Sequence, residues 1–395
     1  ISIQMSALFF LAGVMLYAGL IVRVTPALVA ALMLFSVLLF CTVCLAPDTI
    51  SQNSPNIVVT SIGVLGYVTI MLSLISLRPI RADWLLLFYR RSSAMIVAFI
   101  FLLVVLTDLG VIPGLTREYF HLQNVDLITN YSSMNSVLAD IDYRTRVGIQ
   151  SNIDLFYGEP SFLSLVLFVS LVCHVTSSRV LHHRAEVAPK SFGRYGTRGV
   201  FVPLQICGIA CLIHIQSLSS LVYVAVLLGF FLVSGIRSGK IIRLTPNKVV
   251  ILTLLLLVVV MVAIENFPYY WHRITTFSDS ISAQQRFGIL FDFFPQDFLL
   301  GLHEPTRVPA AGFHNGLIYL VMMSGIGGIC VIVYQLAWLV SKGRRLEVGT
   351  LCMLAALAAF SQNGAIFSPN KLIILSFIFL PLACFKQSFS KKSAV

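Results

Sequence analysis

The first residues whose types suggest chemistry lie where a polar segment meets an apolar stretch, at Gly158-Glu159-Pro160-Ser161-Phe162. Proline suits the first turn of a helix, and a carboxylate beside it suits the helix cap. Glu159 therefore has two interpretations. It satisfies free backbone amides at the helix start, aided by the helix dipole, or it orients or deprotonates a hydroxyl group of a polar substrate. Periodicity favours capping, and the residues alone leave both roles open.

Arginine, and never lysine, is the basic residue of two long polar segments, 114–159 and 266–311. The arginines of interest are Arg144 and Arg146 in the first segment and Arg273, Arg286 and Arg307 in the second. If there were only one or two such arginines, side chains that extend to lipid headgroups would explain them. Several guanidinium groups together instead favour a pyrophosphate, because each forms paired hydrogen bonds with phosphate oxygens. A lipid-linked pyrophosphate is the natural candidate substrate.

A third group of residues opens the next apolar stretch, with Gly312-Phe313-His314-Asn315-Gly316 followed by Ser324-Gly325-Ile326-Gly327-Gly328. The glycines allow close approach of backbones and tight helix packing. Histidine gains and loses a proton near neutral pH, so His314 suits the role of general base. The alternative is a histidine that is merely hydrogen-bonded at a membrane interface.

The elements that must position these residues are membrane helices. Hydrophobic residues make up 58% of the 395 residues, charged residues make up 11%, and the mean hydropathy is +0.92. A water-soluble protein of this composition would expose a very large apolar surface, so the bilayer must be its solvent. The net charge of +11 is spread over short segments between apolar runs, which argues against nucleic acid as a partner.

Apolar runs of about twenty residues predict an all-α, polytopic membrane protein with about eleven spans. The predicted spans are 6–22, 26–46, 57–76, 94–113, 160–181, 200–216, 218–236, 248–265, 312–340, 347–362 and 367–385. Residues 1–395 then form a single integral membrane domain. Segments 114–159 and 266–311 are long enough to carry function; we expect 266–311 to be partly helical and to hold the candidate active site.

Lysine and arginine gather in alternate connections between the predicted spans, which places those connections in the cytoplasm. They are Arg78, Arg81, Arg90 and Arg91; Arg184, Lys190, Arg194 and Arg198; Arg237, Lys240, Arg243 and Lys248; Lys342, Arg344 and Arg345; and Lys386, Lys391 and Lys392. The other connections, 47–56, 114–159, 266–311 and 363–366, contain no lysine and belong outside. Ile1 then lies outside, which predicts one more span upstream and twelve in all.

The order and sidedness of three motifs resemble the superfamily of O-antigen polymerases and ligases, and most of all bacterial Wzy-type polysaccharide polymerases. The motifs are Gly158-Glu159-Pro160-Ser161-Phe162, Arg286 followed about fifteen residues later by Gly301, and His314-Asn315 before Gly325-Ile326-Gly327-Gly328. They cover two regions of the chain, and the rest is similar only as a succession of apolar helices.

The resemblance implies a membrane glycosyltransferase of the GT-C class, in the bacterial inner membrane with its active site facing the periplasm. Its substrates would be oligosaccharides linked to undecaprenyl pyrophosphate, as donor and acceptor, for O-antigen and lipopolysaccharide biosynthesis. A chain-length regulator and a flippase of the same pathway are the implied partners. His314 would be the base, with Glu159 as its competitor or as an orienting group, and Asn315 would contact substrate.

The arginines would divide the two carriers between them. Arg286 would be the principal pyrophosphate ligand, assisted by Arg273 and Arg307, and Arg144 and Arg146 would bind the second carrier. Because a sugar pyrophosphate already has a good leaving group, arginines can neutralise its developing charge. We therefore expect neither a metal ion nor a cofactor.

Two alternatives stay open. The ligase of the same superfamily transfers finished glycan to lipid A-core, although the Glu159-Pro160-Ser161 motif looks more like that of the polymerases. A transporter or flippase of lipid-linked glycans would place ionisable residues inside its spans. The interiors of the predicted spans hold few of them: His174 lies within one span, Asp108 and His214 lie near span ends, and Lys371 lies near the start of the last span.

Overall fold

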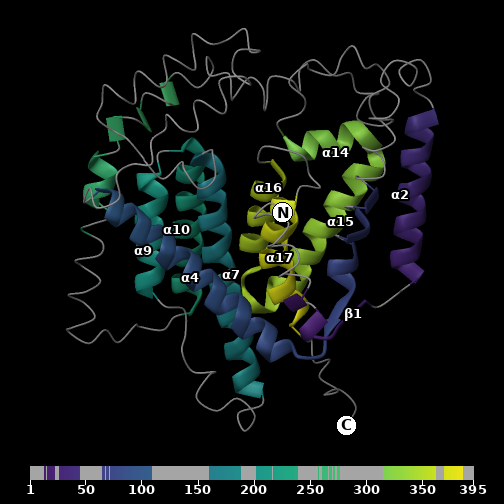
Figure 1. The fold of residues 1–395 in the computed structure, drawn as a ribbon, viewed down its shortest axis with the longest axis horizontal. Coiled ribbons are helices and arrows are strands. Elements are labelled where there is room, and N and C mark those ends of the chain that lie inside the picture. Colours follow the sequence, from purple (N-terminus) through teal and green to yellow (C-terminus); the bar gives the residue numbers. More distant parts are fainter. Residues whose placement is uncertain are drawn as a thin grey trace.

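The chain is described here from a computed structural model. The residues that the structure describes are 13–14, 16–22, 26–44, 65–66, 68–70, 72–108, 160–187, 202–215, 217–238, 257, 260–265, 267–268, 270–271, 274–275, 315–361 and 369–385. Its helices are α2 (Pro26–Cys44), α4 (Ala82–Asp108), α7 (Pro160–Val187), α9 (Val202–His214), α10 (Leu218–Ser238), α14 (Gly316–Ser324), α15 (Ile326–Gly343), α16 (Gly349–Ser361) and α17 (Pro369–Ala383), with the short 3-10 helix η5 (Arg344–Leu346). Figure 1 shows their arrangement.

The predicted all-α class is confirmed for the described residues, with one small addition. Strands β1 (Leu20–Val22) and β2 (Leu77–Pro79) pair antiparallel, with Ile21 opposite Arg78. β1 occupies the last three residues of the predicted helical span 6–22, whereas β2 directly follows the predicted span 57–76. The charge pattern assigns these two ends to the same side. The ribbon therefore joins two chain segments that the prediction had placed next to the same membrane surface.

Three described helices are long and apolar enough to cross a membrane: Ala82–Leu106, Phe162–Ala185 and Ile326–Leu346. At 1.5 Å per residue, helices of this length reach about 30 Å or more, the thickness of the hydrocarbon core. Four shorter apolar helices accompany them: Val202–His214, Leu218–Ser234, Gly349–Ser361 and Lys371–Ala383. These helices are typical of a membrane protein, and the full number of spans stays a prediction.

Two predicted span boundaries were wrong. Helix α4 begins at Ala82 rather than near 94, because the arginines at 90 and 91 were taken as a loop although the helix continues through them. The single predicted span 312–340 is instead divided into α14 and α15 at Gly325. Gly325 has a backbone φ of +53° and ψ of −136°, which only glycine adopts readily.

Helix α7 lies at the centre of the described bundle. It packs against α4, α9, α10, α16 and α17, and nearly all of its apolar stretch within Phe162–Ala185 is buried. One contact is close enough to require glycine, because a Cβ atom on Gly208 of α9 would lie 2.6 Å from a methyl carbon of Leu171. The central position of α7 explains why its serines and its histidine are buried although they are polar.

At one end of the bundle, helix termini that the charge pattern assigned to the cytoplasm lie together. Arg184, near the end of α7, forms an ion pair with Asp83 in the first turn of α4 and donates a hydrogen bond to the carbonyl oxygen of Cys384, which follows α17. We call this the basic end. It lies in the lower part of Figure 1, as does β1.

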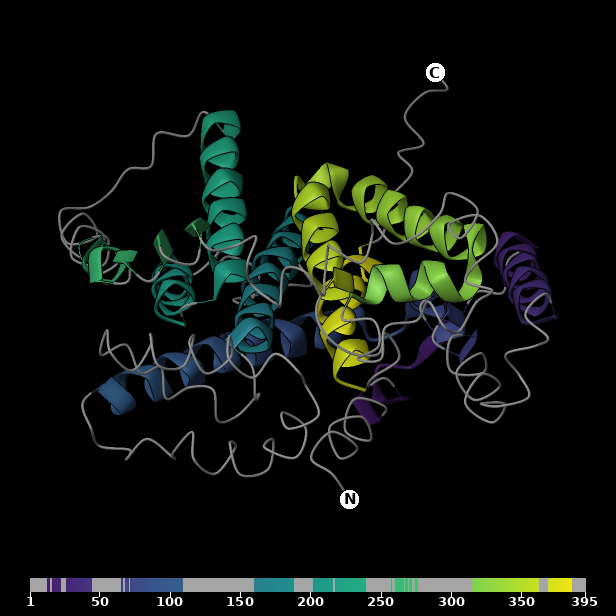
Figure 2. The same ribbon diagram turned by 90° about the horizontal axis from the view of Figure 1, so that it is seen from above.

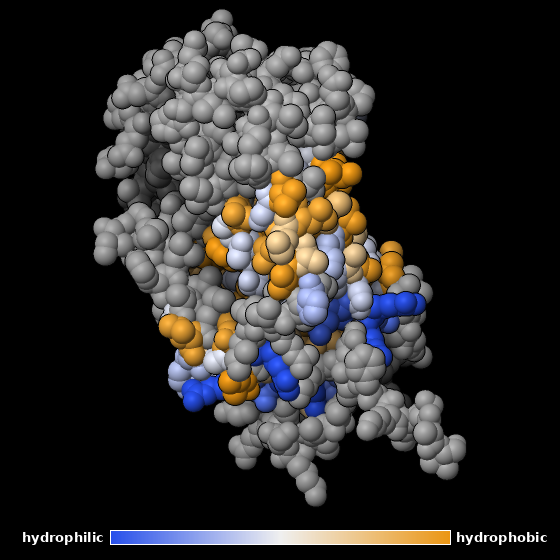
Figure 3. Space-filling model, turned by 90° about the vertical axis from the view of Figure 1, so that its right-hand side faces the viewer, coloured by the Kyte–Doolittle hydropathy of each residue, from blue (hydrophilic) through white to orange (hydrophobic). Residues whose placement is uncertain are grey.

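The outer surface of the described helices is apolar, as expected for helices that face lipid. Large side chains of α2 are exposed, among them Met33, Leu34 and Val37. In Figure 3, which views the right-hand side of Figure 1, apolar residues cover the middle of the described surface and hydrophilic residues gather below them. A band of this kind matches a hydrocarbon core bordered by a polar interface.

Candidate functional site

Of the predicted site residues, only Asn315 is among those that the structure describes. The others lie outside the described residues: Arg144, Arg146, Glu159, Arg273, Arg286, Arg307 and His314. Their predicted roles therefore stay predictions. The structure does describe residues that lie next to or near three of them in the sequence. These are Pro160 after Glu159, Asn315 after His314, and Tyr270 before Arg273.

Asn315 caps helix α14. Its backbone is extended, with φ of −119° and ψ of 117°, and its Oδ1 atom accepts hydrogen bonds from the amides of Leu317, at 3.0 Å, and Ile318, at 3.4 Å. Asparagine is among the best residues at this position because its side chain reaches the free amides of the first turn. The side chain is only 6% exposed, so the cap fixes the helix start next to His314.

The corner between α14 and α15 is closely packed. The amide of Gly325 donates to the carbonyl oxygen of Val321 at 2.6 Å, and Ser324 Oγ donates to the carbonyl oxygen of Leu320 at 2.6 Å. A Cβ atom on Gly328 would lie 2.8 Å from that same carbonyl oxygen. The predicted close backbone approach is confirmed at Gly328. A rigid corner of this kind holds α14 in a fixed orientation relative to α15.

Helix α7 begins at Pro160, in the position that the sequence predicted. Proline at the first helical position leaves no amide without a partner there and has a backbone φ suited to the helix. Glu159 therefore directly precedes the central helix of the bundle. Its capping and catalytic interpretations both stay open.

At the end opposite the basic end, a chain of hydroxyl groups joins α7, α10 and the beginning of segment 266–311. Ser164 of α7 lies 3.3 Å from Ser219 of α10, and Ser219 lies 2.7 Å from Ser217, measured between hydroxyl oxygens. Ser220 donates to the carbonyl oxygen of Ser217 and lies 3.0 Å from the hydroxyl oxygen of Tyr270.

Tyr270 completes this chain by donating a hydrogen bond from its hydroxyl group to the carbonyl oxygen of Ile213, at 2.6 Å. Tyr270 is 4% exposed and lies three residues before Arg273 in the sequence. The Glu159 motif and the arginine segment are therefore each a few residues from the same hydrogen-bonded chain. We had not predicted these residues, because serines and a tyrosine near span ends carry no distinctive sequence signal.

The interior of the bundle holds several polar side chains that composition did not reveal. His174, in the middle of α7, lies with Nδ1 3.3 Å from the carbonyl oxygen of Arg90. Its Nε2 atom, the hydroxyl of Ser178 and the side-chain amide of Gln205 on α9 are buried and have no hydrogen-bond partner among the residues that the structure describes. Buried polar atoms without partners are costly and mark places of functional interest or of adjustable structure.

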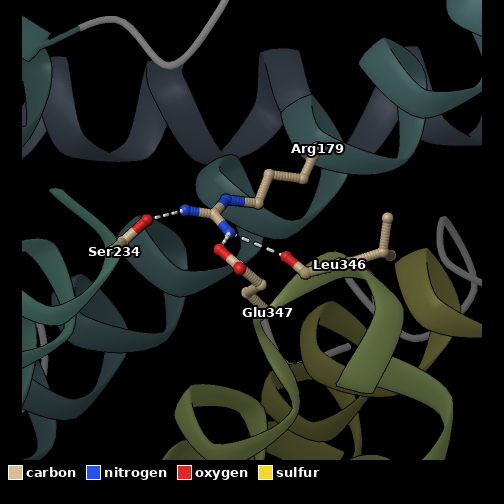
Figure 4. A network of polar contacts seen from close by, with 4 residues as sticks. All are labelled: Arg179, Ser234, Leu346 and Glu347. Carbon is tan, nitrogen blue, oxygen red and sulfur yellow. Dashed lines mark hydrogen bonds and ion pairs between the residues drawn. The ribbon is translucent and has the colours of Figure 1, made fainter. Parts of the chain in front are cut away.

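Toward the basic end, Arg179 of α7 connects α10 to the turn between η5 and α16 (Figure 4). Its guanidinium group donates to Ser234 of α10 and to the carbonyl oxygen of Leu346, at 2.7 Å, and forms an ion pair with Glu347 at 3.3 Å. Glu347 has a backbone φ of +56°, in the left-handed region that ends η5 before α16 begins. Arg179 therefore supports the tight turn between η5 and α16.

Among the described residues, no group of three or more histidine, cysteine, aspartate or glutamate side chains is arranged to hold a metal ion. Comparison of the chain with known protein families, with curated proteins and with solved structures finds no match.

Proposed function

We propose that this protein is a polymerase of oligosaccharide repeat units linked to undecaprenyl pyrophosphate, acting at the periplasmic face of the bacterial inner membrane. The observation that carries the proposal is the hydroxyl chain from Ser164 to Tyr270. It ties the helix that follows Glu159 to the chain segment that precedes Arg273, at the end opposite the basic residues. Because α7 directly follows Glu159 and Tyr270 precedes Arg273 in the sequence, this link supports placing the two motifs on one side of the membrane.

The third motif supports the same arrangement. Asn315 caps the start of α14, which Figure 1 shows at the upper edge of the bundle, away from β1, and which Figure 2 shows from above beside α15. Helix α14 packs against α16, and α16 packs against α7. Helix α14, which follows His314 in the sequence, therefore starts on the side where α7 also begins. This arrangement supports the proposal that the three motifs act on the same side.

In the proposed reaction, a hydroxyl oxygen of the acceptor sugar attacks the anomeric carbon of the donor. The new glycosidic bond forms as the bond between that carbon and the pyrophosphate oxygen breaks. His314 takes the hydroxyl proton, and undecaprenyl pyrophosphate leaves with its negative charge bound by Arg286, assisted by Arg273 and Arg307. The growing chain is thus transferred to the next lipid-linked repeat unit, which Arg144 and Arg146 hold.

Asn315 has two compatible roles in this proposal. Its Oδ1 atom is occupied by the helix cap, whereas its amide nitrogen is a donor suited to a phosphate or sugar oxygen. Such a residue would connect the orientation of α14 to that of the substrate.

Arg286 provides the first test. Arg286→Ala should abolish polymer, and Arg286→Lys should restore little of it, because an ammonium group lacks the paired donor geometry of a guanidinium group. The matched control is Arg344→Ala, which removes an exposed arginine at the basic end and should leave polymer unchanged. Polymer length is read on a gel from a deletion strain that expresses each variant at equal level. Full-length polymer in both Arg286 variants would reject the assignment.

A transporter of lipid-linked glycans is the second candidate function, and one observation favours it. His174, Ser178 and Gln205 place inside the bundle polar atoms that have no hydrogen-bond partner in the described part of the chain, and a translocation pathway would need polar atoms there. In that case Gln205→Leu should stop glycan from reaching the outer leaflet, whereas a polymerase should tolerate this change far from its site.

A further inference from the structure

We propose that the β1–β2 ribbon and the start of α4 form a binding surface for the headgroup of an anionic phospholipid, in the leaflet at the basic end. The surface consists of five residues, Tyr17, Arg78, Ile80, Arg81 and Trp84, and is called the headgroup surface below. It is separate from the proposed catalytic site, which lies toward the opposite end, and it does not depend on the proposed function.

The ribbon builds this surface from two distant parts of the chain. Gly19 has a backbone φ of +61°, and a Cβ atom placed on it would lie 3.2 Å from the side chain of Ile80. The amide of Arg81 donates to the carbonyl oxygen of Ala18 at 3.0 Å. The tight turn at Gly19 therefore lets the segment before β1 close over the turn that joins β2 to α4.

Aromatic contacts fix the surface to the bundle. The guanidinium carbon of Arg81 lies 4.5 Å from the ring centroid of Tyr17. Tyr17 in turn meets Trp84 edge to face, with centroids 4.6 Å apart, and Trp84 stacks on Phe88 at 5.6 Å. A guanidinium group held over an aromatic ring is oriented before any ligand arrives, which lowers the entropic cost of binding.

The charge of the surface is positive. Arg78 and Arg81 are exposed, and neither forms an ion pair with any residue that the structure describes. The nearby carboxylate, Asp83, is already paired with Arg184. Two guanidinium groups are thus available to phosphate oxygens, to which they can donate paired hydrogen bonds.

The exposed apolar groups indicate that the phosphate belongs to a lipid rather than to a soluble ion. Ile80 is 68% exposed, Tyr17 is 53% exposed and Trp84 is 38% exposed. Tyrosine and tryptophan are typical of the membrane interface, where their rings lie beside the headgroups and the first carbons of the acyl chains. A free phosphate would leave these three side chains in water, whereas a phospholipid covers them and neutralises the arginines at once.

Fluorescence of Trp84 reports directly on the lipid at this surface. The full chain carrying Trp271→Phe and Trp338→Phe retains Trp84 as its single tryptophan. It is reconstituted in nanodiscs that contain equal mole fractions of phosphatidylglycerol and phosphatidylcholine, with brominated acyl chains on one or the other. We expect brominated phosphatidylglycerol to quench Trp84 severalfold more strongly, because each arginine enriches anionic lipid by about fivefold.

Substitutions separate a local site from the general attraction of a basic surface. Arg78→Gln with Arg81→Gln should make the two brominated lipids quench equally. Arg344→Gln with Arg345→Gln, which removes the same charge from η5, should leave the preference intact. Arg78→Lys with Arg81→Lys should retain most of the preference and provides a folded variant if the glutamine pair does not fold. The proposal would be overturned if the two brominated lipids quench the parent equally. It would also be overturned if the glutamine pair keeps the preference for phosphatidylglycerol, or if the η5 control loses that preference as fully as the glutamine pair does.

Discussion

Asn315 links the described structure to the proposed chemistry, and its substitution by alanine removes both hydrogen bonds that cap α14. Loss of an N-cap costs about 1 kcal/mol. Here the cap is buried, so the amides of Leu317 and Ile318 lose their partner with little access to water. The cost should therefore approach about 2 kcal/mol. Thermal unfolding of the purified protein in one detergent measures this difference.

Asn315→Asp is the matched variant, because aspartate caps a helix as well as asparagine does. It removes the donor nitrogen and adds a negative charge beside the proposed pyrophosphate. We expect Asn315→Asp to unfold at the temperature of the parent and yet to make little polymer, whereas Asn315→Ala should lose both stability and polymer. If Asn315→Asp makes normal polymer, Asn315 only caps α14. If Asn315→Ala is as stable as the parent, the cap does not hold the helix start.

Two further predictions concern the bundle rather than the site. Arg179→Lys should lower the free energy of unfolding by about 1 kcal/mol, because an ammonium group cannot reach Ser234 and Leu346 together as the guanidinium group does. The cost is small because the contacts are partly exposed. An unchanged denaturation midpoint would contradict the bridging role of Arg179. Gln205→Leu should raise the free energy of unfolding by about 1 kcal/mol, since it removes buried polar atoms that have no partner among the described residues and keeps a similar side-chain volume. A destabilised variant would show that the amide has a partner in the folded protein.

The sequence predicted well those features that depend on local chemistry. Pro160 begins α7 where a proline at the first turn should, and Gly328 allows the close backbone approach expected of its glycine cluster. The helix termini near Arg184 also meet at one end, as the alternation of charged connections required. Each of these features is determined by a few neighbouring residues or by a rule that acts on every span.

Other features depend on contacts that no local pattern reveals. The division at Gly325 was missed because apolar residues continue on both sides of it and glycine is common in membrane helices. The beginning of α4 was misplaced because the charged pair at 90 and 91 resembles a loop, although a helix near the basic end can present arginines toward the interface. Tyr270 gains its role from hydrogen bonds to residues of α9 and α10, which lie 57 and 50 residues away along the chain.

The most direct test of the proposed function is deletion of the gene in its native host, followed by separation of the surface glycan on a gel. The three candidate functions leave different products. A polymerase predicts a single repeat unit attached to lipid A-core, restored to full-length glycan by the parent gene and not by Arg286→Ala. Polymer that accumulates on undecaprenyl pyrophosphate would instead identify a ligase, and an unchanged glycan pattern would contradict the account as a whole.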